Sequence, residues 1–323
     1  MTDTISIVSP VYGCKDCLKA LYQGVCEAFE GSNFDWELVL VDDRGPDDPW
    51  PQIIELARAD ERVCGVRLSR NHGQHLAIWA GLAEARGDWV AVMDCDLQDD
   101  PSIIPALHKT AVTQQLEAVI VDRGSWSDSW FRRATSRTFY RIIDLLGGIN
   151  IQNVGNFGLY SRRMVDTLLL YEEQEVFLPM MVALTGLKRD TYKLDRSGRA
   201  AGQSSYSTMR LLRMAIAIVI RFSDRPLKLS VVIGFAFSSF AALISIFLVI
   251  LWILDIFTVP GWTSTVLSVW FLSGLIMATL GLHGFYLGRV FAEVKKRPRI
   301  IISEKTAAQQ NVPCEVPDAI SKG

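Results

Sequence analysis

Residues 89–101 read WVAVMDCDLQDDP, and this short stretch decides how the first half of the chain is interpreted. It begins with an apolar run that contains valine and tryptophan, which is typical of a buried β-strand. Carboxylate and amide side chains follow at once, at Asp94, Asp96 and Gln98. In an open parallel sheet, ligands bind beyond the carboxyl ends of such strands. The stretch therefore indicates an α/β fold with a polar site at one edge of its sheet.

On both sides of this stretch, short β-rich runs alternate with longer helical patterns. Strands are predicted at 5–9, 37–41, 63–68, 89–93 and 118–121, and helices at 18–29, 52–59 and 75–85. Such alternation is typical of βαβ units that build a parallel sheet. Because the strands are mostly apolar, we expect helices on both faces of a mostly parallel sheet.

The predicted strands end in polar residues. These are Tyr12, Asp42, Asp43, Arg70, Asn71, Asp94 and Asp96. Since the carboxyl ends of parallel strands meet at one edge, we expect these side chains to converge on one site. No G-x-G-x-x-G pattern opens a helix after any of these strands, which argues against a dinucleotide-dependent dehydrogenase.

The last third of the chain is a predicted membrane module. Hydrophobic residues make up 50% of the chain, and the apolar excess is concentrated after Leu227, at 230–254 and 266–287. Each of these runs is long enough, at about 1.5 Å per residue, to cross a hydrocarbon core of about 30 Å. A buried hairpin of a large soluble protein is the alternative, but buried core helices rarely stay uncharged for more than about 18 residues.

Charge and cysteine usage indicate the compartment. Lys and Arg flank the outer ends of the two runs and are absent from 255–265, so the positive-inside rule predicts a two-pass protein with both termini in the cytoplasm. The N-terminus lacks the features of a secretory signal, so residues before Ser204 should be cytosolic. The six cysteines are scattered, and we expect buried thiols rather than a disulfide framework.

Two basic stretches lie between the predicted sheet and the apolar runs. Residues 127–146 carry four arginines on a helical pattern, which fits either a solvated helix face or an anion-binding surface. Residues 204–225 have an apolar body with basic edges, as an interfacial helix on an anionic leaflet requires. The net charge is −2 and the first two hundred residues lack a basic stripe with aromatics, so we expect no nucleic-acid binding.

Asp94, Asp96 and Gln98 are candidate metal ligands. Oxygen ligands at a strand end suit a hard cation such as Mg²⁺ or Mn²⁺, which is commonly held by a few carboxylates together with substrate phosphates. A turn or helix cap is the alternative role for a lone D-x-D. His72 and His75 have the spacing of a metal pair without a third ligand, so contacts at a helix N-terminus are favoured.

Several motifs together cover nearly the whole chain. They are SIVSPVYG (6–13), ELVLVDDRGPDD (37–48), LSRNHGQHLAIWAGL (68–82), DCDLQDDP (94–101), NVGNFGLYSRRMVD (153–166), RAAGQSSYS (199–207) and FSDRPLKL (222–229). In these motifs the chain resembles the family 2 inverting glycosyltransferases, and among them the polyprenyl-phosphate sugar transferases of the dolichol-phosphate mannose synthase type. The resemblance implies a Rossmann-like GT-A fold and metal-dependent sugar transfer from a nucleotide-diphosphate sugar. UDP is favoured over GDP as the nucleotide, and the choice between them is left open.

The resemblance also implies roles for individual residues. Pro10, Tyr12, Asp43 and Arg70 would surround the nucleotide base, with Asp42 nearby. Asp94, Asp96 and Gln98 would hold the metal against the diphosphate, which Arg199 would reach from a closing loop. For Asp42 and Asp43 the alternative is an Asx turn.

Some positions depart from the family pattern. Asn156 stands where relatives often have Asp, and an amide cannot accept a proton as a base would. A polyprenyl phosphate needs no such base because its oxygen is already anionic. Arg123 and Arg132 correspond approximately to family arginines that hold the lipid phosphate, with Arg133 as a competitor for Arg132.

The leading hypothesis is therefore sugar transfer to an undecaprenyl or dolichyl phosphate at the cytoplasmic membrane face. The alternatives are transfer to a hydroxyl of a lipid-linked glycan and a catalytically weak membrane scaffold. A homo-oligomer is left open, as is the role of His283 within the second apolar run, where ionisable residues are functional candidates. The expected parts are a cytosolic catalytic domain at 1–203, an amphipathic segment at 204–228, a transmembrane hairpin at 229–288 and a cytosolic basic and polar tail at 289–323.

Overall fold

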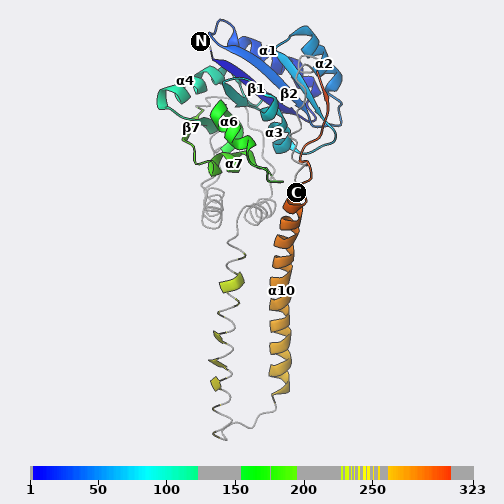
Figure 1. Ribbon diagram of the computed structural model, residues 1–323, viewed down its shortest axis with the longest axis vertical. Helices are drawn as coiled ribbons and strands as arrows, with labels where there is room; N and C mark the ends of the chain where they lie inside the picture. The colour runs from blue at the N-terminus through cyan, green and yellow to red at the C-terminus, as the bar shows by residue number, and fades with distance from the viewer. Residues whose placement is uncertain are drawn as a thin grey trace, which may run out of the picture. The chain divides into compact units, whose positions relative to one another are not determined.

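The chain divides into two units, and an eight-stranded sheet forms the centre of the first. The computed structural model describes residues 3–122, 154–174, 176–194, 261–306 and scattered positions between 227 and 254. The first unit includes the residues from Pro298 onward, whereas Ala201–Arg297 belong to the second. The order of the strands in the sheet is β7-β5-β6-β4-β1-β2-β3-β8. Figure 1 shows the neighbouring strands β1 and β2 of this sheet.

The central strands run parallel, as the alternating pattern predicts. They are β1 (Thr4–Val11), β2 (Asp35–Asp42), β3 (Val63–Leu68) and β4 (Trp89–Val92). The helices between them are α1 (Leu18–Phe29), α2 (Trp50–Ala59) and α3 (Gln74–Glu84). β1 pairs in parallel with β2 and β4, and β2 pairs in parallel with β3. The predicted α/β fold with a mostly parallel sheet is confirmed.

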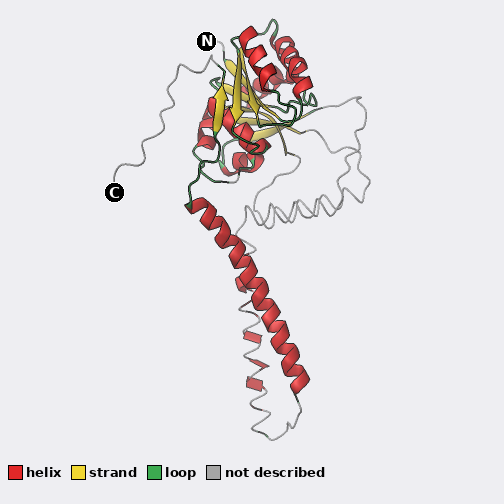
Figure 2. Cartoon of the chain, turned by 90° about the vertical axis from the view of Figure 1, so that its right-hand side faces the viewer, coloured by secondary structure: helices red, strands yellow, loops and turns green. Residues whose placement is uncertain are grey.

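Helices cover both faces of the sheet (Figure 2). Ile5 and Ile7 of β1 lie in a core with α1, α2 and α4 (Ile104–Gln114) on one face of the sheet. Val8 of the same strand points to the opposite face and lies in a second core with α3. This alternation follows from the two-residue period of a strand. Gly81 lets α3 lie close to the sheet, because a Cβ atom there would be 2.3 Å from Val8 Cγ1.

The remaining strands make the sheet mixed. They are β5 (Ala118–Asp122), β6 (Val154–Ser161) and β7 (Arg189–Lys193). β6 runs antiparallel to both β4 and β5, and β5 runs parallel to β7. Two helices, α6 (Arg162–Leu169) and α7 (Leu178–Leu184), join the same core as α3. The Ser161 hydroxyl begins α6 by accepting a hydrogen bond from the Met164 N–H at 3.1 Å.

Strand β8 (Ile302–Lys305) comes from the part of the chain that was expected to be a tail. It pairs antiparallel with β3 and so becomes an edge strand of the sheet. The expected tail at 289–323 is therefore divided. Its first residues, up to Val294, continue a helix, and 302–305 join the sheet of the first unit.

The second unit contains the long helix α10 (Trp262–Val294). Within it, Ser268–Val294 is the one helix among the described residues that is long and apolar enough to cross a membrane, and its apolar window is not buried. It overlaps the expected second span and extends past it at the carboxyl end. The first expected span, 230–254, is described only at scattered positions, which are helical before Leu254. The expected interfacial segment at 204–225 lies outside the described residues.

Candidate active site

The loops that follow β1, β2, β3 and β4 are tied together at one edge of the sheet, as the sequence predicted. The Asp43 N–H after β2 donates to the Val11 carbonyl of β1 at 3.1 Å. The Gln74 side-chain amide after β3 donates to Asp94 Oδ1 after β4 at 2.5 Å. The first bond joins β1 to β2 and the second joins β3 to β4. Asp43 links the two pairs, because its carboxylate accepts from N–H groups that follow β3.

Asp43 links the end of β2 to the start of α3. Its buried carboxylate accepts hydrogen bonds from the N–H groups of His72 at 2.7 Å and Gly73 at 2.9 Å. Burial raises the pKa of Asp43, and the two N–H donors oppose that shift. Asp43 therefore fixes the loop that carries the candidate base-binding residue Arg70, which is exposed.

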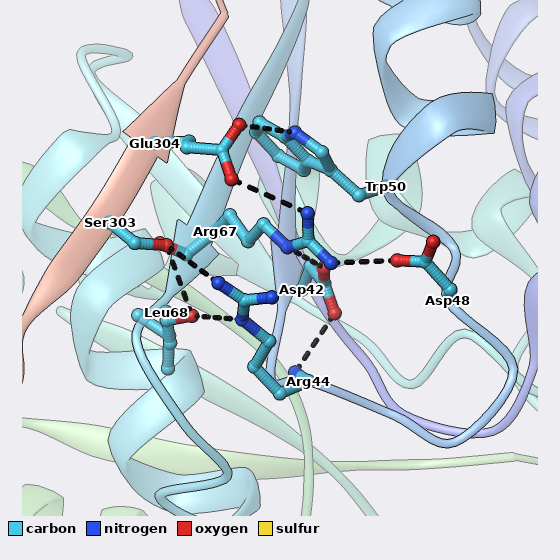
Figure 3. A network of polar contacts seen from close by, with 8 residues as sticks. All are labelled: Asp42, Arg44, Asp48, Trp50, Arg67, Leu68, Ser303 and Glu304. Carbon is cyan, nitrogen blue, oxygen red and sulfur yellow. Dashed lines mark hydrogen bonds and ion pairs between the residues drawn. The ribbon is translucent and has the colours of Figure 1, made fainter.

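Asp42 is engaged on both of its carboxylate oxygens (Figure 3). Oδ1 accepts a hydrogen bond from the Arg44 N–H at 2.9 Å, which is the local turn expected as the alternative role. Oδ2 lies 3.0 Å from Nε of Arg67, and the Asp42 side chain is fully buried. The surroundings of Asp42 thus hold the loop after β2 in place rather than present its carboxylate to solvent.

The residues after β4 offer oxygen atoms at the same edge. Asp94 is half-buried, whereas Asp96 and Gln98 are exposed. The Gln98 N–H donates to Asp96 Oδ1 at 3.1 Å across Leu97, whose φ is 61°. Oxygen donors of this kind fit a hard divalent cation that shares its coordination with substrate phosphates. Among the described residues, no group of three or more His, Cys, Asp or Glu side chains is arranged to hold a metal alone.

The loop after β1 presents Tyr12 to solvent. The side chain of Tyr12 is 54% exposed, whereas Pro10 is buried within the strand. The loop after β2 contacts the backbone of this segment. The Lys15 N–H donates to Asp47 Oδ2 at 2.7 Å, and a Cβ atom on Gly45 would be 2.8 Å from the Gly13 nitrogen. An exposed aromatic ring on a held loop is suited to stacking on a planar base.

A disulfide between Cys14 and Cys95 joins the loops after β1 and β4. The prediction of buried thiols is therefore wrong for these two residues. Cys17, Cys26 and Cys64 are free, and of these Cys64 is buried whereas Cys17 and Cys26 are partly buried. Spacing could not reveal the pair, because 81 residues separate its members. Only the parallel neighbours β1 and β4 bring them within reach of each other.

His72 and His75 do not form a metal site in the described part of the chain. Burial lowers the pKa of His75 to about 4, and its ring packs edge-on against Phe177 with 4.8 Å between centroids. Burial also lowers the pKa of His72, helped by Arg70 and opposed by Asp43 and a hydrogen bond to the backbone of Arg299. His72 lies just before α3, where its N–H donates to Asp43, and His75 lies in the first turn of α3 with its ring against Phe177.

A sequence profile for Glycosyl transferase family 2 matches residues 6–169. The chain belongs to glycosyltransferase family 2. The matched region begins in β1 and ends with α6, so it includes all four polar strand ends.

Relatives within family 2 are similar over almost their whole length. An undecaprenyl-phosphate 4-deoxy-4-formamido-L-arabinose transferase of Aeromonas hydrophila is 33% identical, with 95% of this chain and 96% of the relative covered. A prophage bactoprenol glucosyl transferase homolog of Escherichia coli is 32% identical, with 92% and 98% covered. An SfII prophage-derived bactoprenol glucosyl transferase of Shigella flexneri is 31% identical, with 93% and 97% covered.

Some predicted site residues of this family 2 chain lie outside the described residues. They are Arg123, Arg132, Arg133 and Arg199. Asn156 is described and lies half-buried on β6. Strand β6 pairs with β4, and Asp94 and Asp96 follow β4 in the chain. The roles of these residues stay predictions.

Two residues that support the family 2 site were not predicted. Gln74 contacts Asp94, and Arg67 pairs with Asp42. Arg67 carried a signal in the sequence, because it is the single charged residue of the strand VCGVRL. A charge near the end of a buried strand requires a partner. Gln74 carried no comparable signal, since polar residues are common in the first turn of a helix.

Proposed function

We propose that this chain transfers a sugar from a nucleotide-diphosphate sugar to a polyprenyl phosphate at the cytoplasmic face of a membrane, with inversion at the anomeric carbon. The observation that carries the proposal is the end-to-end similarity to relatives that are named for transfer to undecaprenyl phosphate or bactoprenol. The apolar helix α10 supports a membrane location, and we extend this to a two-pass topology.

The donor would bind across the ends of the parallel strands. Tyr12 would stack on the base, with Pro10, Asp43 and Arg70 around it and Asp42 holding the loop behind. Arg199 would contact the diphosphate. UDP is the expected nucleotide. The exposure of Tyr12 and Arg70, beside the buried Asp42 whose two oxygens contact Arg44 and Arg67, supports this division between contact and support.

Asp94, Asp96 and Gln98 would hold Mg²⁺ or Mn²⁺ near the diphosphate. A bound divalent cation supplies positive charge where the leaving group gains negative charge. The exposed carboxylate of Asp96 is free to turn toward a ligand with little loss of packing, whereas Asp94 is oriented by Gln74.

The acceptor oxygen would form its bond to the anomeric carbon on the face opposite the departing diphosphate, which takes the electron pair of the breaking bond. A phosphate is ionised at neutral pH, so this chemistry needs positioning more than proton removal. Asn156 is compatible with such an acceptor, because no base is required. Arg123 and Arg132 would hold the lipid phosphate.

Nucleotide release by the purified full chain in detergent tests the proposal. UDP- and GDP-sugars are supplied with Mn²⁺, with and without undecaprenyl phosphate. We expect release of the nucleotide diphosphate to depend on both the lipid phosphate and the metal, and to stop when EDTA is added. Release that is indifferent to the lipid phosphate would contradict the proposal.

A further inference from the structure

Strand β8 is bound to β3 by more than its ladder of backbone pairs. The Ser69 N–H donates to the Ile301 carbonyl at 2.8 Å, and the Thr306 N–H donates to the Gly65 carbonyl at 3.0 Å. The Thr306 hydroxyl accepts a hydrogen bond from the Gly65 N–H at 3.0 Å. Residues 301–306 thus run along β3 as far as the strand end that leads to Arg70.

The side chain of Arg67 contacts three carboxylates on different elements (Figure 3). Its Nε lies 3.0 Å from Asp42 Oδ2, one terminal nitrogen lies 2.7 Å from Asp48 Oδ1, and the other lies 3.3 Å from Glu304 Oε1. The two terminal nitrogens donate hydrogen bonds to Glu304 and Asp48, and Nε lies within ion-pair distance of Asp42, so the planar guanidinium is held from three sides. Arg67 therefore connects β8, through Glu304, to the loop after β2, through Asp48.

Glu304 orients Arg67 from the β8 side. Its Oε1 pairs with Arg67, and its Oε2 accepts a hydrogen bond from the indole N–H of the buried Trp50 at 3.0 Å. The neighbouring Ser303 hydroxyl contacts the carbonyls of Arg67 and Leu68 and accepts from Arg44 at 3.4 Å. The Glu304 side chain is 49% exposed, and its contact with the buried Trp50 orients the carboxylate toward Arg67.

These contacts affect the part of the site that is proposed to bind the donor nucleotide. Asp42 is fully buried, and Arg67 is the one cation paired with it in the described residues. A buried carboxylate depends strongly on the orientation of its counter-charge. The same loop, through Gly45 and Asp47, holds Gly13 and Lys15 beside the exposed Tyr12. A shift of Arg67 would therefore be passed to the loop that presents Tyr12.

We propose that Glu304 is a positioning residue for the nucleotide site, acting through Arg67 on Asp42 and the loop after β2. The inference rests on the proposed function only in assigning the Tyr12 edge to the donor nucleotide. It gives the segment after α10 a part in donor recognition, although that segment lies far outside the region matched to the family, residues 6–169.

The chain offers a matched control on the same strand. Lys305 pairs with Glu84 at 2.7 Å and makes no contact with Arg67 among the interactions of the described residues. Lys305→Gln therefore removes an ion pair from β8 while leaving the Arg67 network intact. Glu304→Gln removes the charge next to Arg67 and retains an oxygen that can accept from Trp50.

The test measures the affinity of the full chain in detergent for UDP or GDP in the presence of Mn²⁺, by calorimetry. We expect Glu304→Gln to weaken nucleotide binding by about fivefold, with Lys305→Gln close to wild type and with similar thermal midpoints for the two variants. The KM for the lipid acceptor should not change. The double variant with Arg67→Lys should bind no more weakly than Arg67→Lys alone, since both changes act on one network.

Equal nucleotide affinity in Glu304→Gln and Lys305→Gln would overturn the inference. Additive losses in the double variant would do so too, as would a large fall in thermal midpoint with unchanged affinity, which indicates a role in strand docking only.

Nucleotide binding does not involve the lipid. A chain that binds nucleotide in this pattern but does not use polyprenyl phosphate would contradict the proposed acceptor and leave this inference intact, whereas a wild type that binds neither nucleotide would overturn both.

Discussion

Asp96 and Asp94 follow the same strand but differ in their surroundings. Asp94 is half-buried and accepts a hydrogen bond from Gln74, whereas Asp96 is exposed and contacts only the local N–H of Gln98 among the bonds described. The fold therefore has little need of the Asp96 charge. A large effect of its removal on catalysis would point to a ligand rather than to stability.

Asp96→Asn should lower turnover by about 100-fold, or about 3 kcal/mol, because it removes a charge from the proposed metal and diphosphate site. Membrane insertion and thermal midpoint should be unchanged. Asp100→Asn is the matched control, because Asp100 is also exposed and accepts from the Ser102 N–H at 2.9 Å in a short cap. Near-normal turnover in a folded Asp96→Asn protein would refute the metal assignment.

His75 predicts a pH dependence of stability. Burial lowers its pKa from the ordinary 6.5 to about 4. Between these values the unfolded chain binds a proton that the folded chain does not, so stability is complete above about pH 6.5 and is lost as the pH falls toward 4. The slope from this residue is at most about 1.4 kcal/mol per pH unit. Thermal midpoints in detergent should show a smaller pH dependence for His75→Gln than for wild type, and equal dependence would contradict the assignment.

At the scale of elements, the regular part of the fold was readable from the sequence. β1 to β4 and their crossover helices have strong apolar patterns and ordinary turn residues, so local preference and tertiary packing agree. β6 and β8 lack that agreement. β6 contains Gly155, Asn156 and Gly158, and β8 reads ISEK, so neither looks like a strand until its neighbour in the sheet is known.

The candidate site was predictable to a similar degree. Polar residues at parallel strand ends converge because of the topology, which the alternation predicts. The support behind them was not predictable, since Arg67 and Glu304 are separated by 237 residues. The Cys14–Cys95 pair was missed for the same reason. Contacts between distant segments depend on strand order, which is not encoded in local spacing.

Helix α10 leads to a prediction about topology. Its apolar segment, Ser268–Val294, is followed by basic residues at 295–297, and the connection before it has no Lys or Arg. Reporters at both termini should therefore be found in the cytoplasm, and a reporter near Gly261 on the opposite side. Protease protection in sealed vesicles would measure this. A cytoplasmic reporter at Gly261 would show that the hairpin is wrong.

At the scale of the whole molecule, the central claim is that the acceptor is a phosphate. The full-length similarity to family 2 relatives and the Asn at position 156 agree with that claim. Asn156→Ala should have a mild effect on turnover, because no base is lost.

Arg123→Ala should weaken use of the lipid acceptor by about 30-fold, or about 2 kcal/mol, with little change in donor affinity.

The most direct test compares two acceptors that differ only in the phosphate. Steady-state rates are measured for the purified chain with undecaprenyl phosphate and with undecaprenol, under the same donor and metal concentrations. The account predicts efficient transfer to the phosphate and almost none to the alcohol, whose hydroxyl would require a base. Efficient transfer to undecaprenol would contradict it and would favour a hydroxyl acceptor.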